Sequence, residues 1–469
     1  MSSPPPIESS PPPSALDRAR RKAYLRLIPI LFVCYVIAYV DRTNVSIAKL
    51  TMTKDLAGFN NEVIGFGAGI FFIGYFLLEI PGTLIVERWS ARKWISRIML
   101  TWGVVAALTA LVKTPAQFYT ARFFLGLAEA GFFPGVIVYL THWFPSRDRA
   151  RALSWFLIAT PVAQCISPKI CNLLLPIGST QTIDGAVVHF PKLLGLAGWQ
   201  WIYIAWGIPA VVLGVLVLIF LTDRPRLARW LEPEEREALE AELEREKAAR
   251  QGGRHMTVLE ALGHPKVLLL AAAYFFIVTG NYGVEIFLPS ILQRWYDPGY
   301  DLLTWVLMIP PLGSLVGQLL VGWSSDRTHE RRLHAAVPIY LGAATLACTL
   351  LRGHPLWLMI VLFTLAATGL KAYLPAFWSL PSLFLTEAAA AGSIGLINSV
   401  GNLGGFIGPF VLGYVETKTG SFVPGIVFLS VSMAISATIL VLLGLGRQVP
   451  KSGDPAAVDP LAEALPEPV

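Results

Sequence analysis

Two adjacent charges, Asp41 and Arg42, stand inside an otherwise apolar stretch that runs from Leu27 to Leu50. A charge within a helix of hydrocarbon length is costly, and it is generally retained for transport, proton relay or ion binding. The pair therefore predicts a protein that carries a solute across a membrane.

A second pair, Arg122 and Glu129, is spaced by seven residues, which is two helical turns and places both side chains on one helix face. It is either a fixed ion pair or part of a binding site. Arginine keeps its proton under working conditions, whereas a buried carboxylate takes one up readily. We therefore expect Arg42 and Arg122 to hold a substrate carboxylate, and Asp41 and Glu129 to carry protons. Competition for the arginines would link proton entry to anion entry.

Three further charges, Lys169, Glu285 and Lys371, lie in apolar segments. Such side chains reach toward the membrane surface or pair with one another, as Glu285 and Lys371 could. We expect Lys371 to face the substrate cavity and to bind a second carboxylate.

The composition places these charges in a membrane protein. Of 469 residues, 54% are hydrophobic and 14% are charged, which is too apolar for a soluble globular protein. The net charge of +6 does not indicate nucleic-acid binding, because the basic residues gather in short loops between apolar segments, as membrane orientation requires. No metal-ligand spacing or nucleophile–base pairing occurs in the sequence. We expect no metal, no cofactor and no enzymatic activity.

Twelve apolar segments reach the length of about 20 residues that a spanning helix needs. They predict an all-α membrane protein with twelve transmembrane helices in two pseudo-symmetric halves of six. The segments lie near residues 26–50, 62–86, 94–113, 116–141, 150–175, 199–221, 266–292, 302–325, 334–352, 355–385, 388–415 and 422–446. The expected domains are disordered cytoplasmic tails at 1–25 and 447–469, six-helix bundles at 26–221 and 266–446, and a cytoplasmic central loop at 222–265, with an amphipathic helix from Pro233 through Ala249.

Basic residues follow the second, fourth and eighth segments, on the side of the basic N-terminal tail. Because Lys and Arg mark cytoplasmic loops, we expect a multi-pass protein of the inner (plasma) membrane with both termini in the cytoplasm. The halves repeat at a displacement of 240 residues, since Gly82 precedes Glu87-Arg88 as Gly322 precedes Asp326-Arg327. Parallel repeats predict a transport site between the halves near the midplane.

The loop Glu87-Arg88-Trp89-Ser90-Ala91-Arg92-Lys93 resembles the acidic-Arg-x-Gly-Arg-Lys signature of the major facilitator superfamily, with Ser90 where glycine is usual. Its counterpart in the second half begins at Asp326-Arg327. The resemblance implies the twelve-helix fold of that superfamily. It also implies that Glu87, Arg88, Arg92, Asp326 and Arg327 form a cytoplasmic gate.

Within the superfamily, the chain is similar to the anion:cation symporters, including their tartrate and aromatic-acid transporters. The similar motifs are Tyr39-Val40-Asp41-Arg42-Thr43-Asn44, Arg122-Phe123-Phe124-Leu125-Gly126-Leu127-Ala128-Glu129-Ala130 and Asn398-Ser399-Val400-Gly401-Asn402-Leu403-Gly404-Gly405. The resemblance implies substrate contacts at Tyr39, Tyr75, Trp378 and Asn398, and it agrees with proton coupling at Asp41 and Glu129.

We therefore expect a monomeric secondary active transporter that imports a small organic anion in symport with protons by alternating access. Tartrate-like hydroxy acids, sugar acids and aromatic acids all fit. An anion enters a negative cell interior against about 2.3 kcal/mol per charge per 100 mV, which co-transported protons offset. The alternative is a proton-coupled drug or metabolite exporter, although Ala159-Thr160-Pro161-Val162-Ala163 does not reproduce the fifth-helix signature of exporters.

Overall fold

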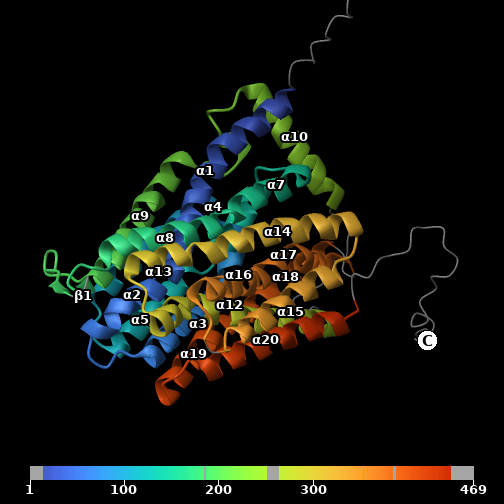
Figure 1. Cartoon of the computed structure of the whole chain (residues 1–469). Helices are drawn as coiled ribbons and strands as arrows, with labels where there is room; N and C mark the ends of the chain where they lie inside the picture. Colours follow the sequence, from blue (N-terminus) through green and yellow to red (C-terminus); the bar gives the residue numbers. More distant parts are fainter. Residues whose placement is uncertain (1–13, 184–185, 251–262, 352, 384–386, 445–469) are drawn as a thin grey trace, which may run out of the picture.

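The computed structural model describes residues 14–183, 186–250, 263–351, 353–383 and 387–444, and most of them are helical (Figure 1). Eleven segments in this part of the chain are long and apolar enough to span a membrane. Helix α15 (Arg332–Cys348) has 17 residues and lies at the ninth expected segment. With it, the structure accounts for the twelve expected helices.

The helices of the first part are α1 (Ala15–Thr43), α2 (Val45–Asp55), α3 (Asn61–Arg88), α4 (Ala91–Leu108), α5 (Pro115–Glu129), α6 (Phe132–Thr141), α7 (Ser146–Leu157), α8 (Ala159–Leu174), α9 (Gly198–Phe220) and α10 (Pro233–Arg250). Those of the second part are α12 (Pro265–Tyr296), α13 (Tyr300–Leu307), α14 (Ile309–Thr328), α15, α16 (Leu356–Ala372), α17 (Leu374–Ser379), α18 (Glu387–Asn402), α19 (Gly404–Thr419) and α20 (Val423–Leu442).

The helices pack into two groups, which we call the first group (α1–α9) and the second group (α12–α20). In the first group α3 packs on α5 and α4 on α9; in the second, α14 packs on α16 and α15 on α20. The groups meet where α3 contacts α19, α2 contacts α12, and α8 contacts α13 and α14. In Figure 1, α1 and α10 reach the top of the view, whereas α14 and α20 run toward the right.

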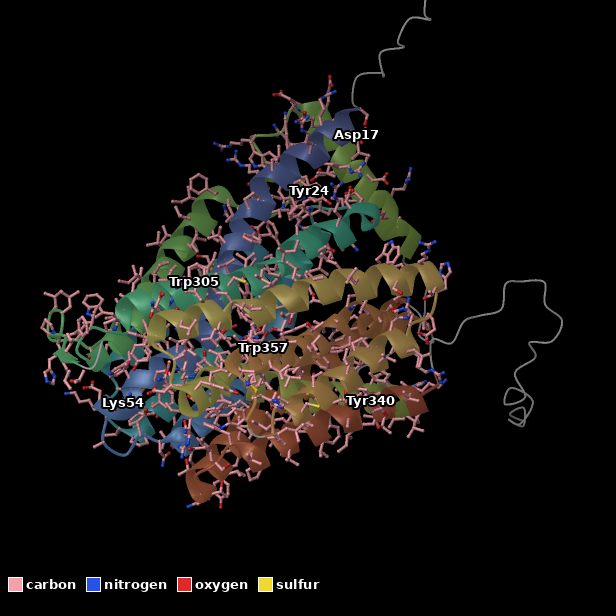
Figure 2. All side chains as sticks on the ribbon, viewed as in Figure 1. Asp17, Tyr24, Lys54, Trp305, Tyr340 and Trp357 are labelled. Carbon is pink, nitrogen blue, oxygen red and sulfur yellow. The ribbon has the colours of Figure 1, made fainter. Side chains whose placement is uncertain are left out.

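Large apolar side chains cover the outside of both groups. Leu442 is 79% exposed and Trp357 is 65% exposed, and Figure 2 labels Trp357 and Trp305. Extensive exposed apolar surface is unfavourable in water and indicates contact with lipid. The outer surface is therefore that of a membrane protein.

Three helices are interrupted within three residues of a charged side chain. The break between α1 and α2 follows Arg42, the break between α5 and α6 follows Glu129, and the break between α16 and α17 follows Lys371. Discontinuous helices free backbone polar groups inside the protein, and transporters use them to build binding sites. A cation at a helix C-terminus, as at Arg42 and Lys371, also interacts favourably with the helix dipole.

Gly131 makes the break between α5 and α6 possible. Its φ is 82°, in the left-handed region that favours glycine. A Cβ atom at this position would lie 3.2 Å from Trp94 Nε1. Both the backbone conformation and the close contact therefore require glycine directly after the Glu129 turn.

Helix α1 begins at Ala15, so the prediction of a disordered tail through residue 25 is wrong for residues 15–25. Ser14 caps the first turn, and Arg20 forms an ion pair with Asp148 of α7. These polar partners stabilise a charged helical turn beyond the apolar span, where the sequence pattern alone indicates no helix.

Contacts with α10 also hold this first part of α1. The Glu235 carboxylate, 1% exposed, accepts from Lys22 at 2.8 Å and from Arg18 at 3.4 Å. Burial alone would raise the pKa of Glu235, but these bonds and one from the Glu232 backbone N–H outweigh it and lower the pKa below its ordinary value. Helix α10 is therefore attached to the first group.

The predicted helix from Pro233 is confirmed as α10. A short antiparallel hairpin of β1 (Thr180–Ile183) and β2 (Ala186–His189) between α8 and α9 was not predicted; its register pairs Thr180 with His189. Residues 1–13 of the expected N-terminal tail and the whole expected C-terminal tail, 447–469, lie outside the described residues.

Candidate functional site

The Arg42 guanidinium connects the two groups of helices. Its Nε and Nη2 donate to Glu129 Oε1 on α5, with Nε at 3.2 Å, and Nη1 donates to the Tyr282 hydroxyl on α12 at 3.1 Å. The guanidinium also lies 5.4 Å and 5.2 Å from the ring centroids of Phe71 and Tyr75 on α3. The structure thus places Tyr75, an expected substrate contact, against the arginine.

Arg122 lies deeper and is 1% exposed. Its Nε donates to the Gly67 carbonyl at 3.3 Å, its Nη2 donates to the Arg42 carbonyl at 3.4 Å, and its guanidinium lies 5.1 Å from the Phe71 ring centroid. Arg122 Nη1 and Glu129 Oε2 have no hydrogen-bond partner among the described residues. Glu129 therefore pairs with Arg42, not in a fixed ion pair with Arg122.

The Asp41 carboxylate is held by neutral donors. Trp102 Nε1 donates to Oδ2 at 2.7 Å, and Asn44 Nδ2 donates to Oδ1 at 3.2 Å. The ion pairs found among the described residues do not include Asp41. Arg42, Arg122, Asp41 and Glu129 thus form a site of two arginines and two acids, with a single ion pair between Arg42 and Glu129.

A second cluster, which we call the interface cluster, consists of Tyr39, Gln164, Glu285 and Lys371. The Tyr39 hydroxyl donates to Glu285 at 3.0 Å and accepts from Lys371 Nζ at 3.3 Å. Gln164 Nε2 donates to Glu285 at 2.6 Å and to Tyr39 at 3.3 Å. Tyr39 and Gln164 belong to the first group and the other two to the second. Tyr39 therefore links Glu285 and Lys371, whose direct pairing was one of the alternatives left open by the sequence.

A cavity of about 90 Å³ adjoins the interface cluster. This volume holds on the order of six water molecules, or a small solute. Its walls come from both groups of helices, and its lining includes Thr43, Ser46, Ser167, Asn281 and Ser314 beside Gln164, Glu285 and Lys371. A polar solute between the groups would meet hydroxyl, amide, carboxylate and ammonium groups there.

The two remaining expected contacts lie on α17 and α18. Asn398 Nδ2 donates to Glu79 of α3 at 2.6 Å. Trp378 packs edge-on against Tyr274, with centroids 5.0 Å apart, and beside Phe377. Asn398 thus joins the two groups, whereas the ring contacts of Trp378 lie within the second group.

The expected gate residues that the structure describes contact their own group. The Arg92 backbone N–H donates at 3.0 Å to the carboxylate of Asp223, which follows α9. Asp326 accepts at 2.6 Å from Arg331. The Arg327 guanidinium lies 5.4 Å from the ring centroid of Trp323 on α14. The side chains of Glu87 and Arg88 lie outside the described part of the structure.

The ends of the two groups that lie away from the basic loops are also in contact, through the buried side chains of Glu416 and Lys49. Glu416 accepts from Asn61 at 2.6 Å and from Arg294 at 2.9 Å. Lys49 Nζ lies 3.5 Å from the Phe287 ring centroid. The Asn61–Glu416 and Lys49–Phe287 contacts between the groups therefore lie away from the basic loops.

Lys169 is not part of the interface cluster. Its Nζ forms an ion pair with the exposed Asp301 at 2.7 Å and lies 3.9 Å from the Trp305 ring centroid. Lys169 therefore reaches toward the surface, which was one of the two arrangements expected for a charged side chain in an apolar segment.

Five residues that make these polar contacts were not predicted from the sequence: Glu79, Trp102, Gln164, Asn281 and Tyr282. Glu79, Gln164 and Asn281 carried a usable signal, because each is a charged or amide side chain in an apolar segment. Trp102 and Tyr282 carried none, since aromatic residues are common in spanning helices. Groups of three metal-ligating side chains do not occur in the described ranges.

Spanning helices, breaks beside buried charges, and polar clusters between two helix groups define a class of protein: a multi-pass membrane transporter. The family model of the Major Facilitator Superfamily matches residues 31–409 and 270–465. The chain belongs to that superfamily, whose members are transporters and not enzymes, and the predicted family and fold are confirmed.

The chain is similar to other transporters along most of its length. A candidate tartrate transporter of Agrobacterium vitis is 40% identical over 435 residues, covering 93% of both chains. A quinolone resistance transporter of Acinetobacter baumannii is 38% identical over 436 residues, covering 91% of this chain and 96% of the relative. The solved xylose transporter XylE of E. coli has a TM-score of 0.67 at 16% identity, covering 89% of this chain and 96% of that chain, and shares the fold.

Proposed function

We propose that this transporter imports an organic carboxylate together with protons by alternating access. The observation that carries the proposal is the Arg42–Glu129 ion pair at two adjoining helix breaks, beside buried Arg122 and Asp41. Two cations and two carboxylates sum to zero charge. An entering anion makes the site negative, which is costly in a low-dielectric interior, and a proton on one acid restores neutrality.

The Arg42 guanidinium is the direct anion contact in this proposal. A carboxylate binds an arginine best through two parallel hydrogen bonds, and Glu129 already uses Nε and Nη2. Substrate therefore competes with Glu129, and protonated Glu129 yields its position more readily. Arg122, behind the Phe71 ring, supplies the second positive charge.

Asp41 is the second proton carrier. Its donors are neutral, so its ionised form adds a full negative charge beside the arginines. Two acids permit more than one proton per anion, and such a surplus offsets about 2.3 kcal/mol per charge per 100 mV of an interior-negative potential.

The interface cluster favours a substrate with a second polar end. Lys371 is suited to a second carboxylate, and Gln164, Asn281 and Glu285 to hydroxyl groups. This chemistry fits a tartrate-like hydroxy acid, and the similarity to candidate tartrate transporters supports it. Sugar acids and aromatic acids are the other substrates to test. Tyr39, Tyr75, Trp378 and Asn398 complete the proposed binding residues.

We further propose that the six-helix bundles at residues 26–221 and 266–446 rock about this site as a monomer in the inner membrane, with the basic loops and both termini cytoplasmic. Glu87, Arg88, Arg92, Asp326 and Arg327 would close the cytoplasmic side.

The test is uptake into proteoliposomes by wild type, Asp41→Asn and Glu129→Gln, with substrate exchange measured separately. The panel comprises tartrate, sugar acids, benzoates, nicotinate and phthalate, with and without a protonophore. Each variant should lose the part of the accumulation that its own proton drives and retain exchange, whereas Asp301→Asn, a surface carboxylate, should behave as wild type. Full accumulation by both acid variants contradicts the assigned roles.

Proton-coupled export is the second candidate, and the similarity to a quinolone resistance transporter favours it. Expression in a drug-sensitive bacterial host separates the two functions. An exporter lowers quinolone susceptibility and quinolone accumulation, while an importer of carboxylates leaves both unchanged.

A further inference from the structure

A third buried carboxylate, Glu79 of α3, lies where the first group contacts α18. It is 5% exposed. Asn398 Nδ2 donates to its Oε1 at 2.6 Å, and Ser399 Oγ donates to its Oε2 at 3.0 Å. Asn402 of the same helix also donates to it. One acid of the first group is thus held by three neutral side chains of the second.

Glu79 is also close to the anion site. It lies one turn after Tyr75 on α3, and the Arg42 guanidinium lies over the Tyr75 ring. The ionisable groups that face Glu79 are Arg42 from α1, Tyr75 from its own helix and Tyr274 from α12. A change of charge at Glu79 is therefore felt by the arginine that would hold the substrate.

A proton on Glu79 Oε1 weakens the bond that Asn398 donates to that oxygen. The Asn398 amide nitrogen only donates, and the hydroxyl oxygen of a neutral carboxylic acid is a weaker acceptor than a charged carboxylate oxygen. Ser399 donates to the other oxygen, Oε2, which remains an acceptor in the neutral acid. Protonation of Oε1 therefore loosens the Asn398 contact while the Ser399 contact persists.

We propose that Glu79 is a further proton-binding site of the transport cycle, and that its protonation releases the Asn398 amide to bind the substrate anion. This inference rests on the proposed carboxylate–proton symport. A proton on Glu79 leaves the charges of Asp41 and Glu129 unchanged. The released Asn398 amide gives the anion one more hydrogen-bond donor. Proton and anion then load together at a contact between the two groups, which must change when the groups move.

The test is Glu79→Gln in proteoliposomes with the membrane potential clamped at zero. Each coupled proton supports about a tenfold substrate gradient per pH unit, so the variant should accumulate about tenfold less per imposed pH unit while retaining exchange. Glu79→Asp keeps an acid and should keep the wild-type ratio. The matched control is Glu416→Gln, a buried α19 carboxylate that accepts from α3 and Arg294, which should leave the ratio unchanged.

An unchanged ratio in Glu79→Gln overturns the inference and leaves the symport proposal standing. Accumulation by wild type that ignores the pH gradient refutes the symport proposal itself. If Glu79→Gln does not fold, Ser399→Ala answers the question, because it removes one donor from the carboxylate. The pH of half-maximal uptake should then move upward by about one unit, and an unmoved profile overturns the inference.

Discussion

Lys371→Met should weaken the binding of a dicarboxylate much more than that of a monocarboxylate. In the structure, the Lys371 ammonium donates to the Tyr39 hydroxyl at 3.3 Å and lines the cavity. Methionine has a similar length and fills the same space without the charge. The substitution therefore tests the charge and not the packing.

The magnitude follows from the hydrogen bond that Lys371 would exchange. A charge-assisted bond to a carboxylate contributes about 1.5–3 kcal/mol, and the bond to Tyr39 that it replaces contributes about 0.5–1.5 kcal/mol. The net loss of about 1–2 kcal/mol corresponds to a roughly 5–30-fold increase in the KM for the dicarboxylate. A monocarboxylate bound at Arg42 should change less than about threefold.

Phthalate and benzoate form a matched pair for this assay, because they share a ring and differ by one carboxylate; tartrate is the third substrate. Uptake into proteoliposomes gives the KM of each. Lys169→Met is the control, since Lys169 pairs with Asp301 outside the interface cluster. Equal changes for phthalate and benzoate, or an equal effect of Lys169→Met, would refute the role of Lys371.

Arg42→Lys should reduce uptake of every carboxylate about 10-fold to 100-fold in kcat/KM, because an ammonium cannot reproduce the forked contact now made with Glu129; uptake kinetics check this, and normal transport would count against a direct anion contact. The lowered pKa of Glu235 predicts that the α1–α10 contact contributes stability above the ordinary glutamate pKa near 4.3 and loses it as the pH falls through the lower folded value. Thermal unfolding of wild type and Glu235→Gln in detergent, from pH 7 to pH 3, checks this, and the variant should lack that acid-dependent step. Gly131→Ala should destabilise the protein by about 1–2 kcal/mol, because it places a Cβ at positive φ against Trp94; an unchanged melting temperature would show that the turn adapts.

The spanning helices and the charges of the first group were predictable because they depend on local pattern. Hydrocarbon-length apolar segments identify the helices, and Asp41, Arg42 and Glu129 are conspicuous within them. Which of these charged residues pair with one another was harder to predict. Spacing on one helix left open a fixed ion pair between Arg122 and Glu129, whereas the breaks after Arg42 and Glu129 bring the latter two together.

The interface cluster shows why the rest could not be predicted. Tyr39, Gln164, Glu285 and Lys371 come from four helices of two groups, and only the packing of the groups makes them neighbours. The helical start at Ala15 likewise depends on ion pairs with distant segments. Contacts of this long range leave no periodic trace in the sequence.

The most direct measurement is simultaneous recording of tartrate and proton movement in sealed proteoliposomes under an acidic-outside gradient. The account predicts that each anion taken up removes at least one proton from the outside medium, and that both fluxes fall together in Arg42→Lys. Uptake of tartrate and the other carboxylates without proton movement, or no uptake of any of them, would contradict it.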